Sequence, residues 1–197
     1  MSLQLEDIEL ICRVKYRYWR AIDMGHIEEV RDLLTEDVRV DFVGGSYRWQ
    51  MEGREVFLSA LAQALNPQII SVHTGHHPEI DVLTSTTAKG VWYLTDTFIH
   101  LTENIVTEGS ALYRDEYLKV DGAWRIKVST YERIYERVDR LAEKPNITAH
   151  YLGKTPLPEA AGGGKNPLPE AAGGGKTQRP EAAGGGAIRR PDVAGEQ

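Results

Sequence analysis

Residues 69–136 alternate between apolar and polar side chains with a period of two, which is the pattern of half-buried β-strands. The predicted strands cover 69–77, 79–83, 86–101, 106–120 and 123–136. Between the last two, Asp121-Gly122 is typical of a two-residue hairpin turn. This stretch therefore predicts a long antiparallel sheet whose strands follow one another along the chain.

The residues before the sheet predict three helices. Apolar side chains recur at helical spacing over 5–22, with an end near Gly25, then over 27–34 and over 56–65. Short strands are expected at 38–42 and 47–51. Helices followed by a long sheet indicate an α+β fold, in which a curved sheet covered by helices forms a cone with an apolar pocket.

The C-terminal residues have a different composition. From Lys154 the sequence repeats with a period of eleven, and each unit contains one Pro-Glu-Ala-Ala-Gly-Gly-Gly segment. Proline and consecutive glycines exclude a regular helix, and the units lack the apolar residues that stacked repeats need. We therefore predict one folded domain at 1–153 and a flexible tail at 154–197.

Charge and cysteine content limit the partners and the compartment. The tail carries six basic and five acidic residues, so the domain holds a net charge of −7 within a chain of −6. An acidic domain argues against nucleic acid and an anionic membrane as partners. The single cysteine, Cys12, allows no intrachain disulfide, and no secretion signal is evident, so a cytoplasmic location is expected.

A carboxylate interrupts the apolar face of the strand at 86–101. Asp96 shares that face with Trp92 and Phe98, where an ionised group needs a partner or a shifted pKa. His73 on a neighbouring strand is the expected partner, because its ordinary pKa lies near neutrality and a carboxylate fixes its tautomer. A buried His–Asp pair beside an apolar cavity indicates acid/base chemistry on an apolar substrate.

The neighbouring histidines do not predict a metal site. Along a strand His73 and His76 point to opposite faces, while His73 and His77 share a face but lie about 13 Å apart. One ion needs ligands roughly 2 Å away, so we expect no metal. His76 and His77 are expected to be structural or at the cavity edge.

Two motifs, Ile70-Ser-Val-His-Thr-Gly-His-His-Pro-Glu-Ile80 and Thr86-Thr-Ala-Lys-Gly-Val-Trp-Tyr-Leu-Thr-Asp96, resemble the SnoaL-like branch of the nuclear-transport-factor-2-like superfamily. Within that branch the sequence is most similar to bile acid 7α-dehydratase, and the segments 18–23 and 131–136 share this similarity. The resemblance implies an α+β cone, a homodimer or homotrimer, and no cofactor. The expectation of no cofactor also agrees with the sequence, in which no glycine-rich nucleotide loop is visible. The resemblance further implies functional roles for five residues: Tyr18, Asp23, His73, Asp96 and Arg133.

These roles define the predicted site. His73 is expected to be the general base and Asp96 the carboxylate that orients it, although Asp96 could instead form a salt bridge with Arg114 or Arg133. Tyr18 is expected to hold an enolate oxygen, or else to be a core aromatic residue. Asp23 is expected to assist proton transfer, or else to be a solvated carboxylate at a helix end.

Three residues are expected to contact the substrate: Arg133, Trp92 and Tyr113. Strict alternation from Trp124 and Ile126 places Arg133 on the outer face, so that it reaches the site only if a β-bulge turns it inward. Without a bulge, Arg133 would lie at the surface or at a subunit interface.

The predicted activity is a cofactor-independent dehydratase, a lyase acting on a hydroxylated polycyclic substrate such as a 3-oxo-4-ene steroid or a bile-acid derivative. Attachment of the substrate to coenzyme A stays open. The same residues would also suit a ketosteroid isomerase or a dehydrochlorinase, and a cone of this kind can instead be a non-catalytic ligand-binding module.

Overall fold

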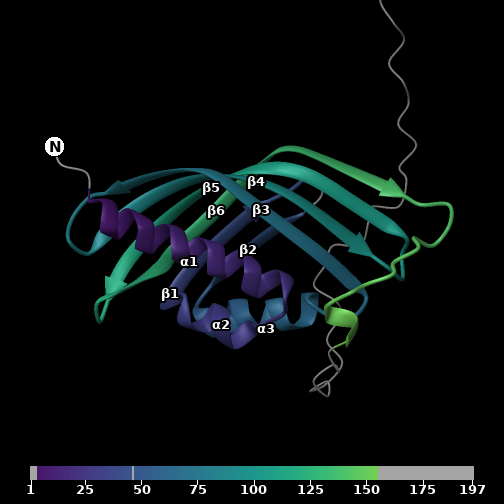
Figure 1. Cartoon of the computed structure of the whole chain (residues 1–197), viewed down its shortest axis with the longest axis horizontal. Helices are drawn as coiled ribbons and strands as arrows, with labels where there is room; N and C mark the ends of the chain where they lie inside the picture. The colour runs from purple at the N-terminus through teal and green to yellow at the C-terminus, as the bar shows by residue number, and fades with distance from the viewer. Residues whose placement is uncertain (1–3, 46, 155–197) are drawn as a thin grey trace, which may run out of the picture.

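The computed structural model describes residues 4–45 and 47–154. Three helices, α1 (Leu5–Asp23), α2 (Ile27–Asp32) and α3 (Arg54–Ala64), lie on one face of a curved six-stranded sheet (Figure 1). The α+β architecture predicted from the sequence is therefore confirmed. Except for Lys154, the tail predicted at 154–197 lies outside the described residues.

The sheet has the strand order β2-β1-β6-β5-β4-β3. Its members are β1 (Leu34–Val43), β2 (Arg48–Glu52), β3 (Ile69–Val82), β4 (Thr87–His100), β5 (Ile105–Val120) and β6 (Ala123–Arg140). All neighbours are antiparallel except β1 and β6, which run parallel. The predicted strands 69–77 and 79–83 form one continuous strand, β3, whose outer edge has no strand partner among the described residues.

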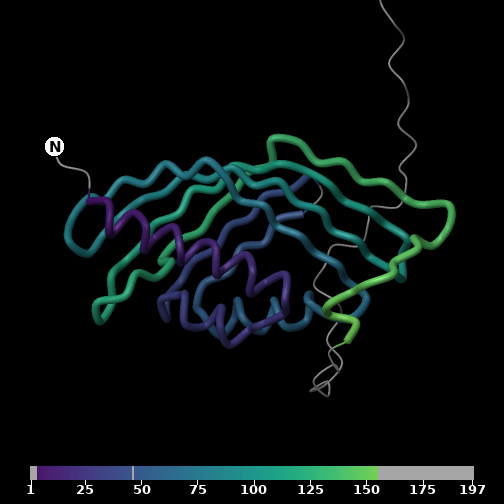
Figure 2. The backbone as a smooth tube through the Cα atoms, viewed as in Figure 1, coloured from purple at the N-terminus to yellow at the C-terminus, as the bar shows by residue number. Residues whose placement is uncertain are grey.

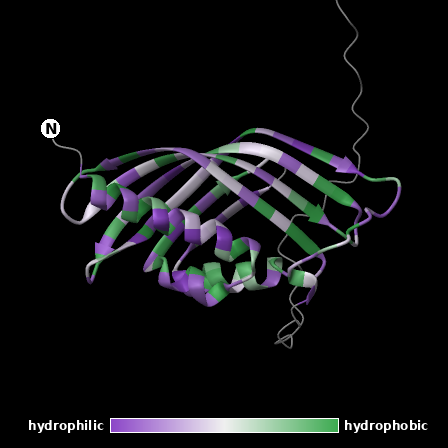
Figure 3. Cartoon of the chain, viewed as in Figure 1, coloured by the Kyte–Doolittle hydropathy of each residue, from purple (hydrophilic) through white to green (hydrophobic). Residues whose placement is uncertain are grey.

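Local conformations follow the turn residues of the sequence. Asp121 and Gly122 both have positive φ, 51° and 79°, as the predicted hairpin between β5 and β6 requires. Gly25, with φ of 67°, directly follows Met24, the residue that caps the end of α1. Along the strands, residues of opposite hydropathy alternate (Figure 3), and most of the buried positions are apolar.

Two β-bulges in β6 change which of its residues face the helices. Glu116 pairs with Val128 while Tyr117 pairs with Ile126, so Lys127 is an extra residue. A second shift leaves Ile134 unpaired, because Ser110 pairs with Tyr135 and Ala111 with Arg133. The first bulge turns Ser129, Tyr131 and Arg133 inward, and the second does the same for Glu136 and Val138.

A buried ion pair lies in the core beneath α1. Lys15 Nζ is 2.7 Å from Asp115 Oδ2, and both side chains are fully buried. Asp115 also accepts hydrogen bonds from the hydroxyls of Tyr117 and Ser129, each at 2.8 Å. The Lys15 ammonium lies 3.8 Å from the ring centre of Tyr113, and burial lowers the pKa of Lys15. The pair thus ties α1 to β5 and β6.

After β6 the chain returns to the helices (Figure 2). His150 Nε2 lies 2.9 Å from the carbonyl oxygen of Ile69, and His26 Nε2 lies 3.3 Å from the Tyr151 hydroxyl. Leu152 is buried so close to Gly25 that a Cβ there would lie 2.8 Å from the leucine side chain. Among the described residues, no helix is both long and apolar enough to cross a membrane.

Asp7, in the first turn of α1, joins that helix to the hairpin of β5 and β6. It accepts hydrogen bonds from Lys119 Nζ at 2.6 Å and from Trp124 Nε1 at 2.8 Å. The bond from Lys119, and then that from Trp124, lowers the pKa of Asp7 below its ordinary 3.8. The stabilisation is therefore complete above pH 3.8 and is lost as the pH falls through the lower folded pKa.

We therefore expect Asp7→Asn to lower the free energy of unfolding by about 1 kcal/mol at neutral pH. The difference from wild type should be smaller at an acidic pH, below 3.8, than at neutral pH, because the wild-type carboxylate becomes protonated as the pH falls through its lowered pKa. Urea unfolding followed by circular dichroism at both pH values measures this. Asp121→Asn, in the exposed hairpin turn, is the matched control. A difference that is equal at both pH values would contradict the proposed role.

Candidate active site

Asp23 and His73 form a hydrogen-bonded pair between the end of α1 and the edge strand β3. His73 Nδ1 lies 2.6 Å from Asp23 Oδ1. The same carboxylate accepts hydrogen bonds from the His73 backbone amide at 2.8 Å and from the Ser71 hydroxyl at 3.0 Å. The backbone amide is available because, among the described residues, β3 has no neighbouring strand on this side. Three donors thus fix the carboxylate, which in turn orients the imidazole.

The predicted pairing of His73 with Asp96 is wrong in its partner, although the two residues are neighbours. They lie directly opposite each other on β3 and β4, on the same face of the sheet. Asp96, however, accepts a hydrogen bond from Arg133 Nη1 at 2.5 Å, one of the two salt bridges considered from the sequence. The imidazole contacts Asp23 instead.

Gly109 on β5 allows Arg133 to reach Asp96. Asp96 pairs with Gly109 in the sheet, and Arg133 lies on β6 beyond it. A Cβ at Gly109 would lie 3.1 Å from Arg133 Nη1 and 2.6 Å from the carbonyl oxygen of Tyr135. The bulge in β6 and this glycine together bring Arg133 to the cavity, so the alternative of a surface or interface location without a bulge does not apply.

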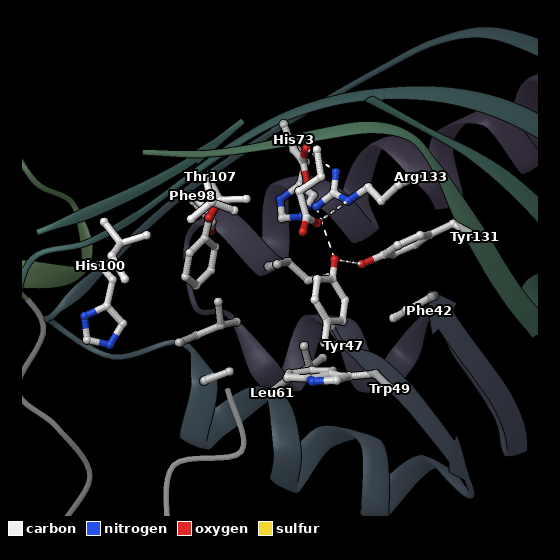
Figure 4. A pocket seen from close by; sticks show the side chains of 18 of the residues that line it. Phe42, Tyr47, Trp49, Leu61, His73, Phe98, His100, Thr107, Tyr131 and Arg133 are labelled. Atoms are coloured by element: carbon white, nitrogen blue, oxygen red, sulfur yellow. Dashed lines mark hydrogen bonds and ion pairs between the residues drawn. The ribbon is translucent and has the colours of Figure 1, made fainter. Parts of the chain in front are cut away.

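Arg133 is the centre of a polar cluster on the cavity wall (Figure 4). Its Nη2 donates to the Tyr47 hydroxyl at 3.2 Å, and its Nε lies 3.2 Å from Glu136 Oε2. The hydroxyls of Tyr47 and Tyr131 are 2.5 Å apart. Burial lowers the pKa of Arg133, but the hydrogen bond to Asp96 and the neighbouring Tyr47 raise it by more, so the side chain stays cationic.

His73, Asp96 and Arg133 border a cavity of about 410 Å³ between the sheet and the helices. Its walls are mainly aromatic and aliphatic. Phe42 is stacked on Tyr131, with ring centres 4.6 Å apart, and this pair forms one wall. Most of the remaining apolar lining comes from α1, β2, α3 and β4, with Ile22, Trp49, Leu61 and Phe98 as examples.

A second hollow borders the pair of Asp23 and His73, called the dyad below, on the side away from the apolar cavity. It measures about 360 Å³ and is lined by residues of α1 and β3 that include Asp23, His73, Arg20 and Thr74. Asp23 borders this hollow and not the apolar cavity, whereas His73 borders both. The structure places Asp23 behind the imidazole because α1 continues as far as Asp23.

Of the other residues predicted for the site, two line the cavity and one lies in the core. Tyr18 and Tyr113 line the apolar cavity. Burial, and then the nearby Asp115, raises the pKa of Tyr18, so its hydroxyl keeps its proton. Trp92 is fully buried, does not line the cavity, and donates from Nε1 to the Tyr117 hydroxyl at 3.0 Å. The prediction that Trp92 contacts the substrate is therefore not supported, because the indole is enclosed by core side chains.

The neighbouring histidines lie outside the cavity. His76 contacts His77 and the Thr95 hydroxyl, and His77 has a positive φ of 52° at the bulge of β3. Within residues 4–45 and 47–154, no group of three or more His, Cys, Asp or Glu side chains has the arrangement of a metal site.

Comparison with known proteins identifies the family and the fold. A family model described as a SnoaL-like domain matches residues 3–130. The chain belongs to the SnoaL-like family. Its fold is shared by a proposed scytalone dehydratase from Novosphingobium aromaticivorans, which is 21% identical with a TM-score of 0.63 over 74% of this chain and 95% of that one.

Two further structures share the SnoaL-like fold. A hexachlorocyclohexane dehydrochlorinase (LinA, type 2) is 16% identical, with a TM-score of 0.63 over 73% of this chain and 96% of that one. A protein of unknown function from Mycobacterium tuberculosis is 25% identical, with a TM-score of 0.54 over 71% of this chain and 75% of that one. At these identities the likenesses concern the fold.

The sequence did not predict three residues of the polar cluster, namely Tyr47, Tyr131 and Glu136. The last two face the cavity only because of the bulges in β6. The sequence contains one indication of a close contact near Tyr47, the preceding pair Gly44-Gly45. In the structure, a Cβ at Gly44 would lie only 2.1 Å from the Tyr47 ring.

Proposed function

We propose that this SnoaL-like protein is a cofactor-independent dehydratase, a lyase that removes water from a hydroxylated apolar polycyclic compound. A 3-oxo-4-ene steroid or a bile-acid derivative is the substrate class we favour, in line with the sequence resemblance to bile acid 7α-dehydratase. The observation that carries the proposal is an imidazole held by a carboxylate at the wall of an apolar cavity, with its second nitrogen unused by the carboxylate.

The Asp23 contact determines how His73 would act. An ionised carboxylate only accepts hydrogen bonds, so Nδ1 of His73 carries the hydrogen and Nε2 keeps a free electron pair. Nε2 is then the general base, while Asp23 stabilises the imidazolium that forms. Asp23 borders the second hollow and not the apolar cavity, so in this proposal the substrate meets His73 and leaves Asp23 on the far side of the imidazole.

The reaction requires no external reagent. Nε2 of His73 takes a proton from a carbon that is acidic through conjugation to the substrate's carbonyl group, and the electron pair forms an enolate. The enolate then expels the hydroxyl group as the C–O bond breaks. The protonated His73 gives its proton to the leaving oxygen, so that water departs and the base is regenerated. Tyr18 lines the same cavity and keeps its hydroxyl hydrogen, as a donor to the substrate must.

The cavity and the relatives support this choice. About 410 Å³ lies within the usual range for small-molecule sites, roughly 300 to 1,000 Å³. Two of the structural relatives are named as enzymes of elimination, one a proposed dehydratase and one a dehydrochlorinase. Ketosteroid isomerisation, halide elimination and ligand binding without reaction are the alternatives.

Product mass distinguishes these alternatives. The protein is incubated with a panel of hydroxylated 3-oxo-4-ene steroids, and the products are analysed by mass spectrometry. Loss of one water supports the proposal, whereas an unchanged mass with a shifted double bond indicates an isomerase. Halogenated analogues test for loss of a hydrogen halide. Ligands that bind, with no change in wild type, would indicate a binding module and contradict the dehydratase.

A further inference from the structure

The hydroxyl groups of Tyr47 and Tyr131 leave one hydrogen without an acceptor among the residues that the structure describes. Each hydroxyl carries one hydrogen, and their contact at 2.5 Å uses one of the two. Arg133 Nη2 only donates, so its bond to Tyr47 consumes an acceptor position and no hydroxyl hydrogen. Among the described residues, these are the side-chain hydrogen bonds that the two hydroxyls form. Whichever tyrosine donates to the other, one O–H remains, and both residues line the cavity.

The surroundings select the kind of atom that this hydrogen would bind. Burial raises the pKa of both tyrosines, so neither hydroxyl ionises near neutral pH. Arg133 is positive, but it lies between Asp96 and Glu136, and the three side chains have a formal net charge of −1. A carboxylate ligand would meet this negative charge, whereas an uncharged carbonyl oxygen accepts the hydrogen bond without that cost.

We propose that Tyr47 and Tyr131 form the subsite that recognises an uncharged carbonyl oxygen of the ligand. The inference rests on the proposed function in assigning this cavity to the substrate, and it specifies a neutral ketone or enone over a carboxylic acid. Tyr131 is held by its stacking on Phe42, and Tyr47 by its position over Gly44. The donor is therefore already oriented before a ligand enters, which limits the entropy lost on binding.

Binding of three small bicyclic probes tests the subsite without any turnover. The probes are the ketone 2-tetralone, the hydrocarbon tetralin and the acid 2-naphthoate, and calorimetry gives the dissociation constants. We expect wild type to bind the ketone about 2- to 10-fold more tightly than the hydrocarbon, the range of one net hydrogen bond. The carboxylate should bind least tightly of the three.

Each single variant keeps one hydroxyl hydrogen, so the decisive variant is the double substitution Tyr47→Phe with Tyr131→Phe. It should lose most of the preference for ketone over hydrocarbon, with Tyr18 and Arg133 as the remaining donors at the cavity wall, whereas the matched double variant Tyr93→Phe with Tyr135→Phe, at two exposed tyrosines, should keep the wild-type preference. A ketone preference that stays at its wild-type value after loss of both hydroxyls would overturn the proposal. So would tight binding of the carboxylate.

A second measurement needs no variant. The carbonyl stretch of isotopically labelled 2-tetralone should move to lower frequency on binding wild type, because a donated hydrogen bond weakens the C=O bond. A bound carbonyl with the frequency it has in a hydrocarbon solvent would overturn the subsite even if the double variant failed to fold. Ketone recognition in a protein that removes water from no steroid would contradict only the dehydratase proposal.

Discussion

Replacing His73 by Gln should lower the rate of water elimination by about 10²- to 10⁴-fold while the protein stays folded. Glutamine cannot take the proton, but it fills a similar volume at a side chain that is 18% exposed. Asp23→Asn should lower the rate over a similar range, because a neutral amide no longer stabilises the imidazolium. The rates are measured on whichever steroid of the panel loses water, with circular dichroism as the check on folding.

The comparison of Asp23→Asn with Asp96→Asn separates the observed pair from the one predicted from the sequence. Asp96 contacts Arg133 and not the imidazole, so its loss should lower the rate at least about tenfold less than the loss of Asp23. His76→Gln is the matched control, since His76 lies outside the cavity. A larger effect from Asp96 than from Asp23 would show that Asp96 is the functional carboxylate.

The same geometry can be tested without a substrate. The Nδ1–H of His73, bonded to a carboxylate at 2.6 Å, should give a strongly downfield proton resonance in NMR spectra. This resonance should disappear in Asp23→Asn and in His73→Gln, and it should persist in Asp96→Asn. Its loss in Asp96→Asn alone would contradict the arrangement described above.

The sequence predicts the site as far as local periodicity extends. Alternation along one strand places Asp96 on the inner face, and pairing of adjacent strands places His73 opposite it. The choice between Asp23 and Asp96 as partner is not local, because it depends on how the end of α1 meets the edge of the sheet. It also depends on Arg133, whose inward direction results from a bulge that alternation cannot reveal.

Two glycines mark where the side chains of the polar cluster lie, but this can be read only after the pairing of the strands is known. Gly109 and Gly44 are each unremarkable in the sequence, yet one lies where the Arg133 side chain passes and the other lies beneath the Tyr47 ring. A glycine in a strand signals a close approach, but its partner comes from a distant part of the chain. The fold was therefore predictable from pattern, and the polar cluster was not.

Asp115→Asn should destabilise the protein by about 3 to 5 kcal/mol, which is a large part of the usual 5 to 15 kcal/mol of a small domain. The substitution leaves the ammonium of Lys15 fully buried without its counter-ion, with aromatic rings as its remaining favourable contacts. Lys15→Met should cost less, because Asp115 then keeps the hydroxyl donors Tyr117 and Ser129. Urea unfolding followed by circular dichroism measures both.

The pH dependence of these variants identifies the buried charge as the cause. Burial already lowers the pKa of Lys15 in the wild type, and loss of Asp115 removes the neighbour that opposes this shift. Between the folded pKa and the unfolded value of about 10.4, the unfolded chain binds more protons, so stability rises with pH. In Asp115→Asn this rise should begin at a lower pH than in wild type, and adding Lys15→Met should abolish it. A loss of stability that does not change with pH, or one below about 1 kcal/mol, would show that the pair does not hold α1 on the sheet.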